Sequence, residues 1–134
     1  MLKQTAYLFS DHATQALHIA ARLAAENGHA TFGAGHLLKA LLHKDLPVLK
    51  FLEARGVDVY YLEEWAEIRI EEYPKGPRPV ADPEEDDQLK AVFKEADHLQ
   101  HKLNYHLIEA ECLLLALATP GVAFSYEQLK TFPL

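Results

Sequence analysis

The amino-acid sequence predicts an all-α domain built from two similar helical units, and three observations support this. A pattern of apolar residues occurs twice, with a constant spacing of 76 residues. In each copy these residues are three and four positions apart, as one face of a helix requires. A proline-rich segment separates the copies and interrupts regular structure. Because a duplicated helical unit buries its apolar face against its copy, we expect a pseudo-twofold arrangement.

The repeat is clearest in a short motif of four apolar positions. Leu37, Leu38, Ala40 and Leu41 recur 76 positions later as Leu113, Leu114, Ala116 and Leu117. The same offset also relates apolar residues that precede this motif. The equivalent positions of Leu17, Ala20, Leu23 and Ala34 are Phe93, Ala96, Leu99 and Ala110. We therefore divide a single domain, residues 1–134, into repeat one at about 9–73, a linker at about 74–82 and repeat two at about 83–132.

Local signals predict the helix boundaries of repeat one. Ser10 is a candidate N-cap for a first helix, which Gly28 ends. A second, almost wholly apolar helix is expected from about Gly35 to His43, and Pro47 opens a short third helix. The segment from Val59 to about Tyr73 has spacings that suit both a helix and a strand, but its length and its glutamates favour a helix.

In repeat two, a pair of start signals competes for the first helix. Asp82-Pro83-Glu84-Glu85 combines a capping aspartate, a proline at the first helical position and an acid three residues on. Asp86 is the alternative start, because it is the counterpart of Ser10. Further helices are predicted over Glu109–Ala118 and, as a short last turn, over Tyr126–Thr131.

Composition excludes several classes of function. Apolar residues make up 49% of the chain and charged residues 25%, which is ordinary for a soluble globular protein. The net charge of −7 and the lack of a basic stripe argue against nucleic acid as a partner, and the lack of a long apolar run argues against a membrane. A single cysteine cannot form an internal disulfide, so we expect a cytoplasmic protein. No glycine-rich phosphate-binding motif is present, so the chain is not expected to hydrolyse ATP.

Candidate catalytic and metal-binding residues are few. His98 and His101 are three residues apart on a predicted helix, but no cysteine or carboxylate completes a familiar metal-ligand spacing with them. His36 begins a buried helix and is expected to hydrogen-bond nearby backbone. Cys112 lies on the most apolar helix and is expected to be a buried, unreactive thiol. We therefore expect no metal, no cofactor and no catalytic residue in this domain.

The two motifs resemble the repeats of the Clp amino-terminal domain. The first copy shows the resemblance in Phe9-Ser10 and in the run Gly28-His29-x-x-Phe32-Gly33-x-x-His36-Leu37-Leu38. The second copy, from Leu107-Ile108 through Glu111 to Leu117, is similar to the degenerate second repeat. The resemblance implies the recognition domain of a Clp-type AAA+ unfoldase or disaggregase, which binds unfolded or helical client segments or an adaptor. It also implies that ATP and Mg²⁺ bind only downstream modules of a hexameric ring, while the isolated domain is a monomer.

The resemblance carries over to particular residues. In some members of the family, the hydroxyl that opens the first helix and the acid that opens the second copy's core helix lie on a protein-binding surface; they match Ser10 and Glu111. Members that recognise phosphorylated arginine use an acid in each copy, whereas Gly35 stands in the first copy here. That glycine and the segment Thr119–Gly121 are also similar to the branch that recycles type VI secretion sheaths by binding a helix of a sheath protein.

Three functions therefore stay open: general client capture, sheath recognition, and a free-standing adaptor on the same fold. In each of them the family resemblance implies a groove between the start of the first helix and the second copy. Half-exposed aromatic residues near a repeat junction suit such a groove, which would accept an apolar helix or an unfolded segment. The residues predicted to line it are Tyr7, Phe9, Ser10, Tyr105 and Glu111.

Overall fold

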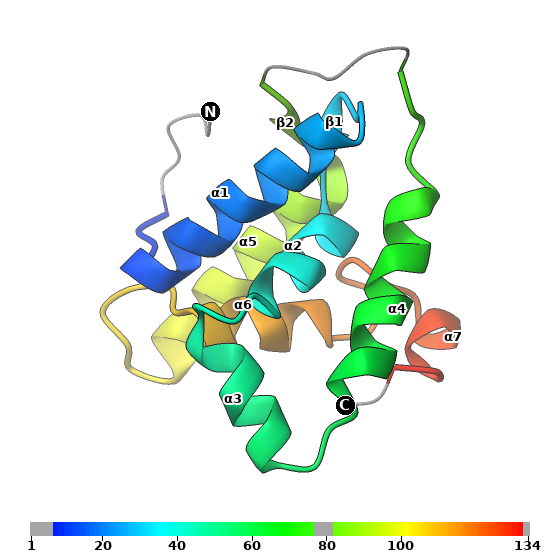
Figure 1. Ribbon diagram of the computed structural model, residues 1–134. Helices are drawn as coiled ribbons and strands as arrows, with labels where there is room; N and C mark the ends of the chain where they lie inside the picture. The colour runs from blue at the N-terminus through cyan, green and yellow to red at the C-terminus, as the bar shows by residue number, and fades with distance from the viewer. Residues whose placement is uncertain (1–6, 77–81, 133–134) are drawn as a thin grey trace.

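The computed structural model describes residues 7–76 and 82–132, and within them the protein is a bundle of short helices (Figure 1). The helices are α1 (Asp11–Glu26), α2 (Ala34–Leu41), α3 (Pro47–Ala54), α4 (Val59–Glu71), α5 (Asp87–Lys102), α6 (Ala110–Leu117) and α7 (Tyr126–Leu129). Two-residue strands, β1 (Thr31–Phe32) and β2 (Glu84–Glu85), are the extended elements of the described segments. The predicted all-α class is confirmed, and the ambiguous segment after Asp58 is a helix.

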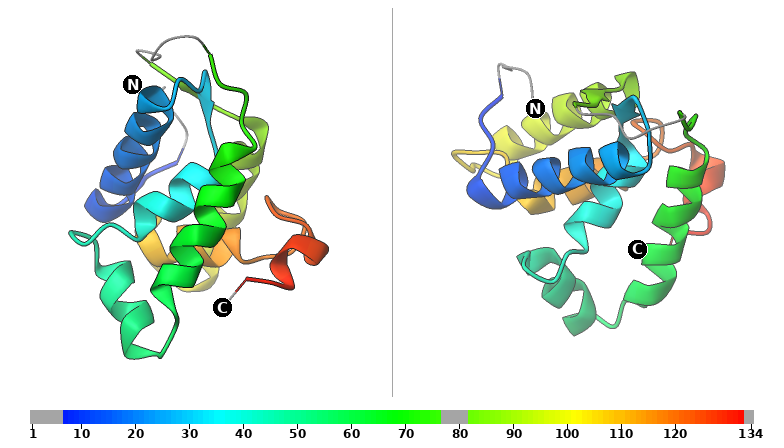
Figure 2. Two further views of the ribbon diagram at one scale, coloured as in Figure 1. Left: turned by 45° about the vertical axis from the view of Figure 1, so that its right-hand side comes forward. Right: turned by 45° about the horizontal axis from the view of Figure 1, so that its top comes forward.

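The arrangement of the helices follows the repeat. The long helices α1 and α5 flank the short central helices α2 and α6, which contact each other in the core (Figure 1). The other helices surround this centre. Helix α4 packs along α2 and crosses in front of it in the left view of Figure 2, whereas α3 lies at the end of the molecule opposite the strands.

The offset of 76 residues holds for the helices themselves. Helices α1 and α5 are both 16 residues long, α2 and α6 are both 8 residues long, and the bounds of each pair differ by 76 at both ends. The caps repeat as well, because the side chains of Ser10 and Asp86 each accept the backbone N–H three residues on. Asp86 is thus the start of α5, and the alternative start at Asp82 is wrong, since Glu84 and Glu85 form β2 instead.

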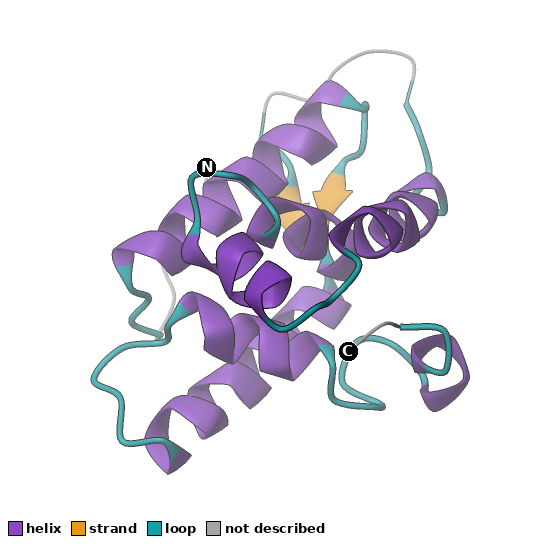
Figure 3. Cartoon of the chain, turned by 60° about the horizontal axis from the view of Figure 1, so that its bottom comes forward, coloured by secondary structure: helices purple, strands orange, loops and turns teal. Residues whose placement is uncertain are grey.

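Short parallel backbone pairings join the two repeats. Phe32 of β1 lies opposite Glu85 of β2, in the pair of strands that Figure 3 shows side by side. At the other end of the same arrangement, Phe9 forms a parallel bridge with Ile108. Adding 76 to Phe9 gives Glu85, and subtracting 76 from Ile108 gives Phe32. The two pairings are therefore equivalent contacts of a pseudo-twofold structure.

The hydrogen bonds at these pairings are equivalent too. The backbone N–H of Ser10 donates to the carbonyl oxygen of Ile108 at 2.9 Å, and that of Asp86 donates to the carbonyl oxygen of Phe32 at 3.0 Å. In both cases the N-cap residue of a long helix in one repeat is hydrogen-bonded to the other repeat. The carbonyl that accepts this bond lies just before the core helix of that other repeat. Each repeat consequently helps to fix where the long helix of its partner begins.

The core is continuous between the repeats. Leu38 and Leu114 occupy equivalent positions of α2 and α6 and belong to the same cluster of buried apolar residues, with exposed fractions of 0% and 5%. Full burial of one leucine side chain contributes about 2 kcal/mol, so the two motifs together supply a large share of the stability.

A buried polar cluster lies where α2 begins. The Nδ1 atom of His36 accepts the backbone N–H of Gly33 at 3.0 Å, which confirms the predicted backbone hydrogen bond of this histidine. Its Nε2 atom lies 3.0 Å from Nδ1 of His29, so His36 must carry its proton on Nε2 and donate it to His29. Tyr73 packs against both rings and donates its hydroxyl to Asp86 at 2.7 Å.

Burial keeps both histidines neutral. Loss of solvation lowers the pKa of His36 to about 4, and a charge on His29 would lower it further. Burial also lowers the pKa of His29. In the unfolded chain a histidine titrates near pH 6.5, so between pH 6.5 and 4 the unfolded state binds more protons than the folded state.

We predict that the free energy of unfolding falls as the pH drops from about 6.5 to 4, and that His36 alone accounts for about 3 kcal/mol of this fall. The His36→Asn variant keeps an acceptor for Gly33 but does not titrate. It should be less stable at pH 7 and should lose less stability over the same interval, as measured by urea unfolding at several pH values. Equal losses in both proteins would contradict the assignment.

Candidate functional site

An open apolar groove lies between α3, the loop before α6, and α6 itself. Its volume is about 390 Å³, and we call it the α3–α6 groove; it is lined by Pro47, Val48, Phe51, Leu103, Tyr105, Glu111, Leu114 and Leu115. Phe51 and Leu115 are each 47% exposed, and Leu103 and Tyr105 are also partly exposed. Large apolar side chains gathered around a hollow and left open to water are typical of a binding surface.

Local sequence explains how each wall forms. Pro47 occupies the first position of α3 and fixes its start, after which Val48 and Leu52 turn into the core and Phe51 turns outward. The guanidinium of Arg55 lies 3.9 Å from the ring centre of Phe51 and covers one face of it. From α6, the groove receives Glu111, Leu114 and Leu115, which are spaced three and four residues apart on one side of the helix.

Glu111 is the charged group of the groove. It lies in the first turn of α6, where the exposed backbone N–H groups favour a negative side chain. Its carboxylate is close enough to Tyr105 to raise the pKa of that phenol above its ordinary value. The groove therefore combines an apolar floor with a single acidic rim, and it suits an apolar segment that carries a positive charge.

The structure separates the five residues predicted to line a groove. Tyr105 and Glu111 lie together in the α3–α6 groove. Tyr7 and Phe9 instead contact Phe93 of α5, with ring centres 6.3 and 5.1 Å away, in an aromatic cluster outside the groove lining. Ser10 is 7% exposed and caps α1. Two of the five residues thus line the α3–α6 groove, and the other three lie at or next to the Phe9–Ile108 bridge, so their part in binding stays a prediction.

Other groove residues were missed by sequence reasoning, and one of them had a readable signal. Leu115 stands where the first copy has the charged Lys39, so the second copy exposes a leucine at a position that its twin keeps polar. Phe51 carried no comparable signal, because its orientation depends on which side of α3 faces the core. Leu103 continues the apolar periodicity predicted for the helix of α5, but as the C-cap residue it is 43% exposed and lines the groove.

In the first repeat, α4 covers the equivalent face of α2, and the hollow that remains beside Gly35 and Arg69 is smaller, at about 290 Å³. A Cβ atom on Gly35 would lie 3.0 Å from Cβ of Arg69 and 3.3 Å from the backbone nitrogen of Ile70. Beside it, Nζ of Lys39 forms an ion pair with Glu67 at 2.9 Å. A side chain at position 35 would therefore require α4 to move outward by a few tenths of an ångström.

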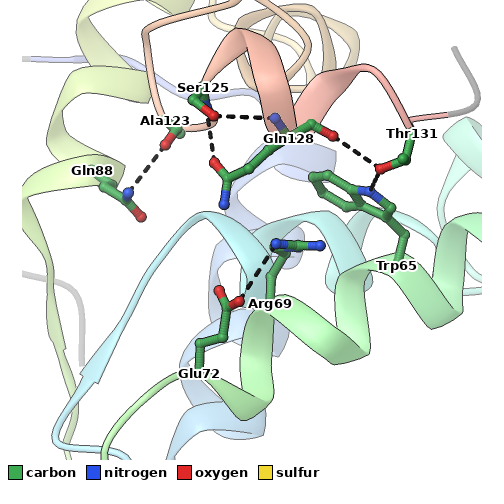
Figure 4. Close-up of polar contacts among 8 residues, drawn as sticks. All are labelled: Trp65, Arg69, Glu72, Gln88, Ala123, Ser125, Gln128 and Thr131. Carbon is green, nitrogen blue, oxygen red and sulfur yellow. Dashed lines mark hydrogen bonds and ion pairs between the residues drawn. The ribbon is translucent and has the colours of Figure 1, made fainter.

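A polar network holds α4 in place (Figure 4). The indole N–H of Trp65 donates to Oγ1 of Thr131 at 2.9 Å, and Gln88 of α5 donates to the carbonyl oxygen of Ala123 at 3.1 Å. Trp65 also packs edge-on against Phe124, with ring centres 4.8 Å apart. The C-terminal segment is therefore tied both to α4 and to α5.

Nothing in the described residues suggests chemistry. No cluster of three or more histidine, cysteine or carboxylate side chains there is arranged to hold a metal ion. Cys112 is buried, and burial raises the pKa of its thiol. Within the same residues, no helix is long and apolar enough to span a bilayer.

Comparison with known families identifies the domain. The family model of the Clp repeat (R) N-terminal domain matches residues 8–128, which is nearly the whole chain. This protein belongs to the Clp repeat N-terminal domain family. The match begins just before the Phe9–Ile108 bridge and extends into α7, so it covers both repeats and every wall of the α3–α6 groove. The predicted family is confirmed.

Solved structures with the same fold come from several Clp-type proteins. The Hsp104 N-terminal domain of Candida albicans is 16% identical, with a TM-score of 0.72 over 93% of this chain and 88% of that chain. The ClpV N-domain of Vibrio cholerae is 20% identical, with a TM-score of 0.76 over 98% of this chain and 84% of that chain. A complex of a ClpV N-domain with a VipB peptide has a TM-score of 0.72 at 20% identity, over 98% and 86% of the two chains.

At these identities the likeness establishes the fold and not the ligand. Among curated protein sequences, none matches the chain significantly. The binding role of this domain therefore has to be argued from its own groove.

The different surroundings of Gly35 and Glu111 give a stability test. The variant Gly35→Glu places the acid of the second copy against α4 and should lower the free energy of unfolding by about 2 kcal/mol or more, because the backbone of α4 must move. The reciprocal variant Glu111→Gly lies in an open groove and should cost about 1 kcal/mol, the ordinary effect of glycine in a helix. Chemical denaturation measures both, and equal costs would contradict the account of the covered face.

Proposed function

We propose that this domain is the client-recognition module of a Clp-type AAA+ protein-remodelling machine, and that it holds client segments in the α3–α6 groove. The observation that carries the proposal is an apolar, solvent-open groove with a single acid on its rim. The domain performs no reaction itself. Its contribution is to bring a client to the ATPase modules of the parent protein.

The geometry favours a helical segment over an extended one. Groove residues on α6 are spaced as one helix face, and α3 forms an opposing wall, so an amphipathic helix fits between them. A β-type client would need an unpaired strand edge to extend, and both short strands of the described chain lie at the opposite end of the molecule. The groove also lacks the row of backbone donors that an extended peptide requires.

Binding through this groove alone should be modest. A groove of about 390 Å³ covers only a few side chains, and an unfolded client loses conformational freedom when it binds. Several copies of the domain on one ring raise the effective affinity, because a client held by one copy is at a high local concentration near the others. Weak single-site binding suits a machine that must release its client into a pore.

Recognition of a sheath-protein helix is the second candidate, and a specific observation favours it. A ClpV N-domain of the same fold has been solved with a VipB peptide. Gly35 in place of an acid argues in the same direction, because recognition of phosphorylated arginine uses an acid in each repeat, and α4 closes the first position here. Under either function we propose a cytoplasmic, monomeric domain of a hexameric parent; a free-standing adaptor is the remaining alternative.

Groove variants test the proposed function directly. The probe is reduced, carboxymethylated α-lactalbumin, a permanently unfolded model client labelled with fluorescein. We expect Leu115→Lys to weaken its binding about tenfold, because a charge in the groove must be desolvated, as measured by fluorescence anisotropy. The matched control is Ile68→Lys on α4, where the native side chain is 51% exposed and outside the groove. This control should bind within about twofold of the unmodified protein.

The same assay tests the residues predicted outside the groove. The variant Phe9→Ala removes part of the aromatic cluster on α5 and should leave client affinity unchanged once its fold is verified by circular dichroism. If Phe9→Ala weakens binding and Leu115→Lys does not, the binding surface is the aromatic cluster and the assignment to the α3–α6 groove is wrong. A pull-down from native extract separates the two candidate functions. Capture of a sheath protein supports sheath recognition, whereas capture of many unrelated misfolded proteins supports general client recognition.

A further inference from the structure

The α3–α6 groove is equivalent, under the pseudo-twofold relation, to the face of α2 that α4 covers. Four pairs of residues related by 76 positions establish this. In each pair, one member touches α4 or the residues directly after it, or lies beside them, and the other member lines the groove. The pairs are Gly35 with Glu111, Lys39 with Leu115, Phe124 with Val48, and His29 with Tyr105.

The contacts of α4 occur in a definite order along its length. Trp65 packs on Phe124 and Glu67 pairs with Lys39. Further on, Arg69 crosses Gly35, and Tyr73, just beyond the helix, packs against His29. The helix therefore has one direction relative to the four positions, and the four equivalent positions around α6 have no helix of the described chain on them.

We propose that a client helix lies across α6 in the groove with the same direction as α4 has across α2. Its N-terminal half then faces Val48 and Leu115, and its C-terminal half faces Glu111 and Tyr105. This proposal rests on the proposed function and adds to it the class of ligand and its orientation. Helix α4 thus serves as an internal model of the ligand, because it occupies over α2 the position that the ligand helix would occupy over α6.

The side chains of α4 also indicate the chemistry that the ligand helix should have. The face that α4 turns inward consists of Leu62, Trp65, Ala66 and Ile70, all buried, with Arg69 at its edge. Its apolar residues match the leucine and aromatic lining of the groove. In repeat one Arg69 lies against a glycine, whereas in repeat two the same place on the helix meets Glu111. A ligand helix should therefore carry a large apolar residue followed, four positions later, by a basic one.

Steric differences between the two positions are small. The contact between Arg69 and a Cβ at residue 35 is 3.0 Å, so a helix placed equivalently on α6 needs to move outward by only a few tenths of an ångström to clear Glu111. Attraction between a basic side chain and the carboxylate opposes that displacement. The sequence of α4 itself is consequently a suitable probe for the open groove.

The test uses a peptide of residues 59–71 added to the complete 134-residue domain. A lactam bridge between Glu64 and the lysine of an Ile68→Lys change holds the helix on its exposed side, because a free helix of this length is marginal in water. A nitroxide label is attached to either end, and paramagnetic broadening of methyl resonances reports which end lies near which wall. The N-terminal label should broaden Val48 and Leu115, and the C-terminal label should broaden Leu103.

Every other outcome overturns the proposed orientation. The orientation is wrong if the N-terminal label broadens Leu103 and the C-terminal label broadens Val48 and Leu115. It is also wrong if the peptide shows no saturable binding at millimolar concentration. Binding unaffected by Leu115→Lys would mean that the peptide displaces the domain's own α4 and does not enter the groove. A peptide with Trp65→Ala should bind about tenfold more weakly, and equal binding would contradict the match of apolar faces. Failure here leaves the unfolded-client assay intact, so the orientation and the proposed function are tested separately.

Discussion

The backbone pairing that crosses between the repeats is the constraint on which the rest of the structure depends. Ser10 donates to Ile108 and Asp86 donates to Phe32, so the first residue of each long helix is positioned by the other repeat. These bonds are few, but they set the register in which α2 and α6 meet. Once that register is fixed, the leucine motifs of the two repeats are buried in one core, and neither repeat is complete without its copy.

The proposed binding surface lies where the structure departs from this symmetric centre. Repeat one continues into α4, which packs along α2 so closely that a side chain at Gly35 would push it outward by a few tenths of an ångström. Repeat two continues into the short α7 and the C-terminal segment, which bind Trp65 of α4 and leave the corresponding face of α6 open. Within the described residues, one face of the symmetric centre is thus covered by a helix, and the equivalent face of α6 is open.

The sequence alone predicted most of the symmetric part of the structure and little of the asymmetric part. Repeated leucines and caps such as Ser10 and Asp86 are local signals, and the helices that they predict are present. Tyr105 and Glu111, both predicted for a binding groove, lie together in the α3–α6 groove. Phe51 was not predicted, because its exposure depends on how α3 is oriented by contacts distant in sequence. The sequence did not indicate that Tyr7 and Phe9 pack on α5, because that contact joins residues far apart in the chain.

Native-state hydrogen exchange tests the mutual dependence of the repeats most directly. If each repeat is stable only against the other, the backbone amides of α2 and α6, and those of Ser10 and Asp86 at the two crossings, should exchange through one global unfolding event. Their exchange free energies should then converge on a single value as low concentrations of denaturant are added. Protection of one core helix that persists after the other has opened would show that a repeat folds alone, and would contradict this account.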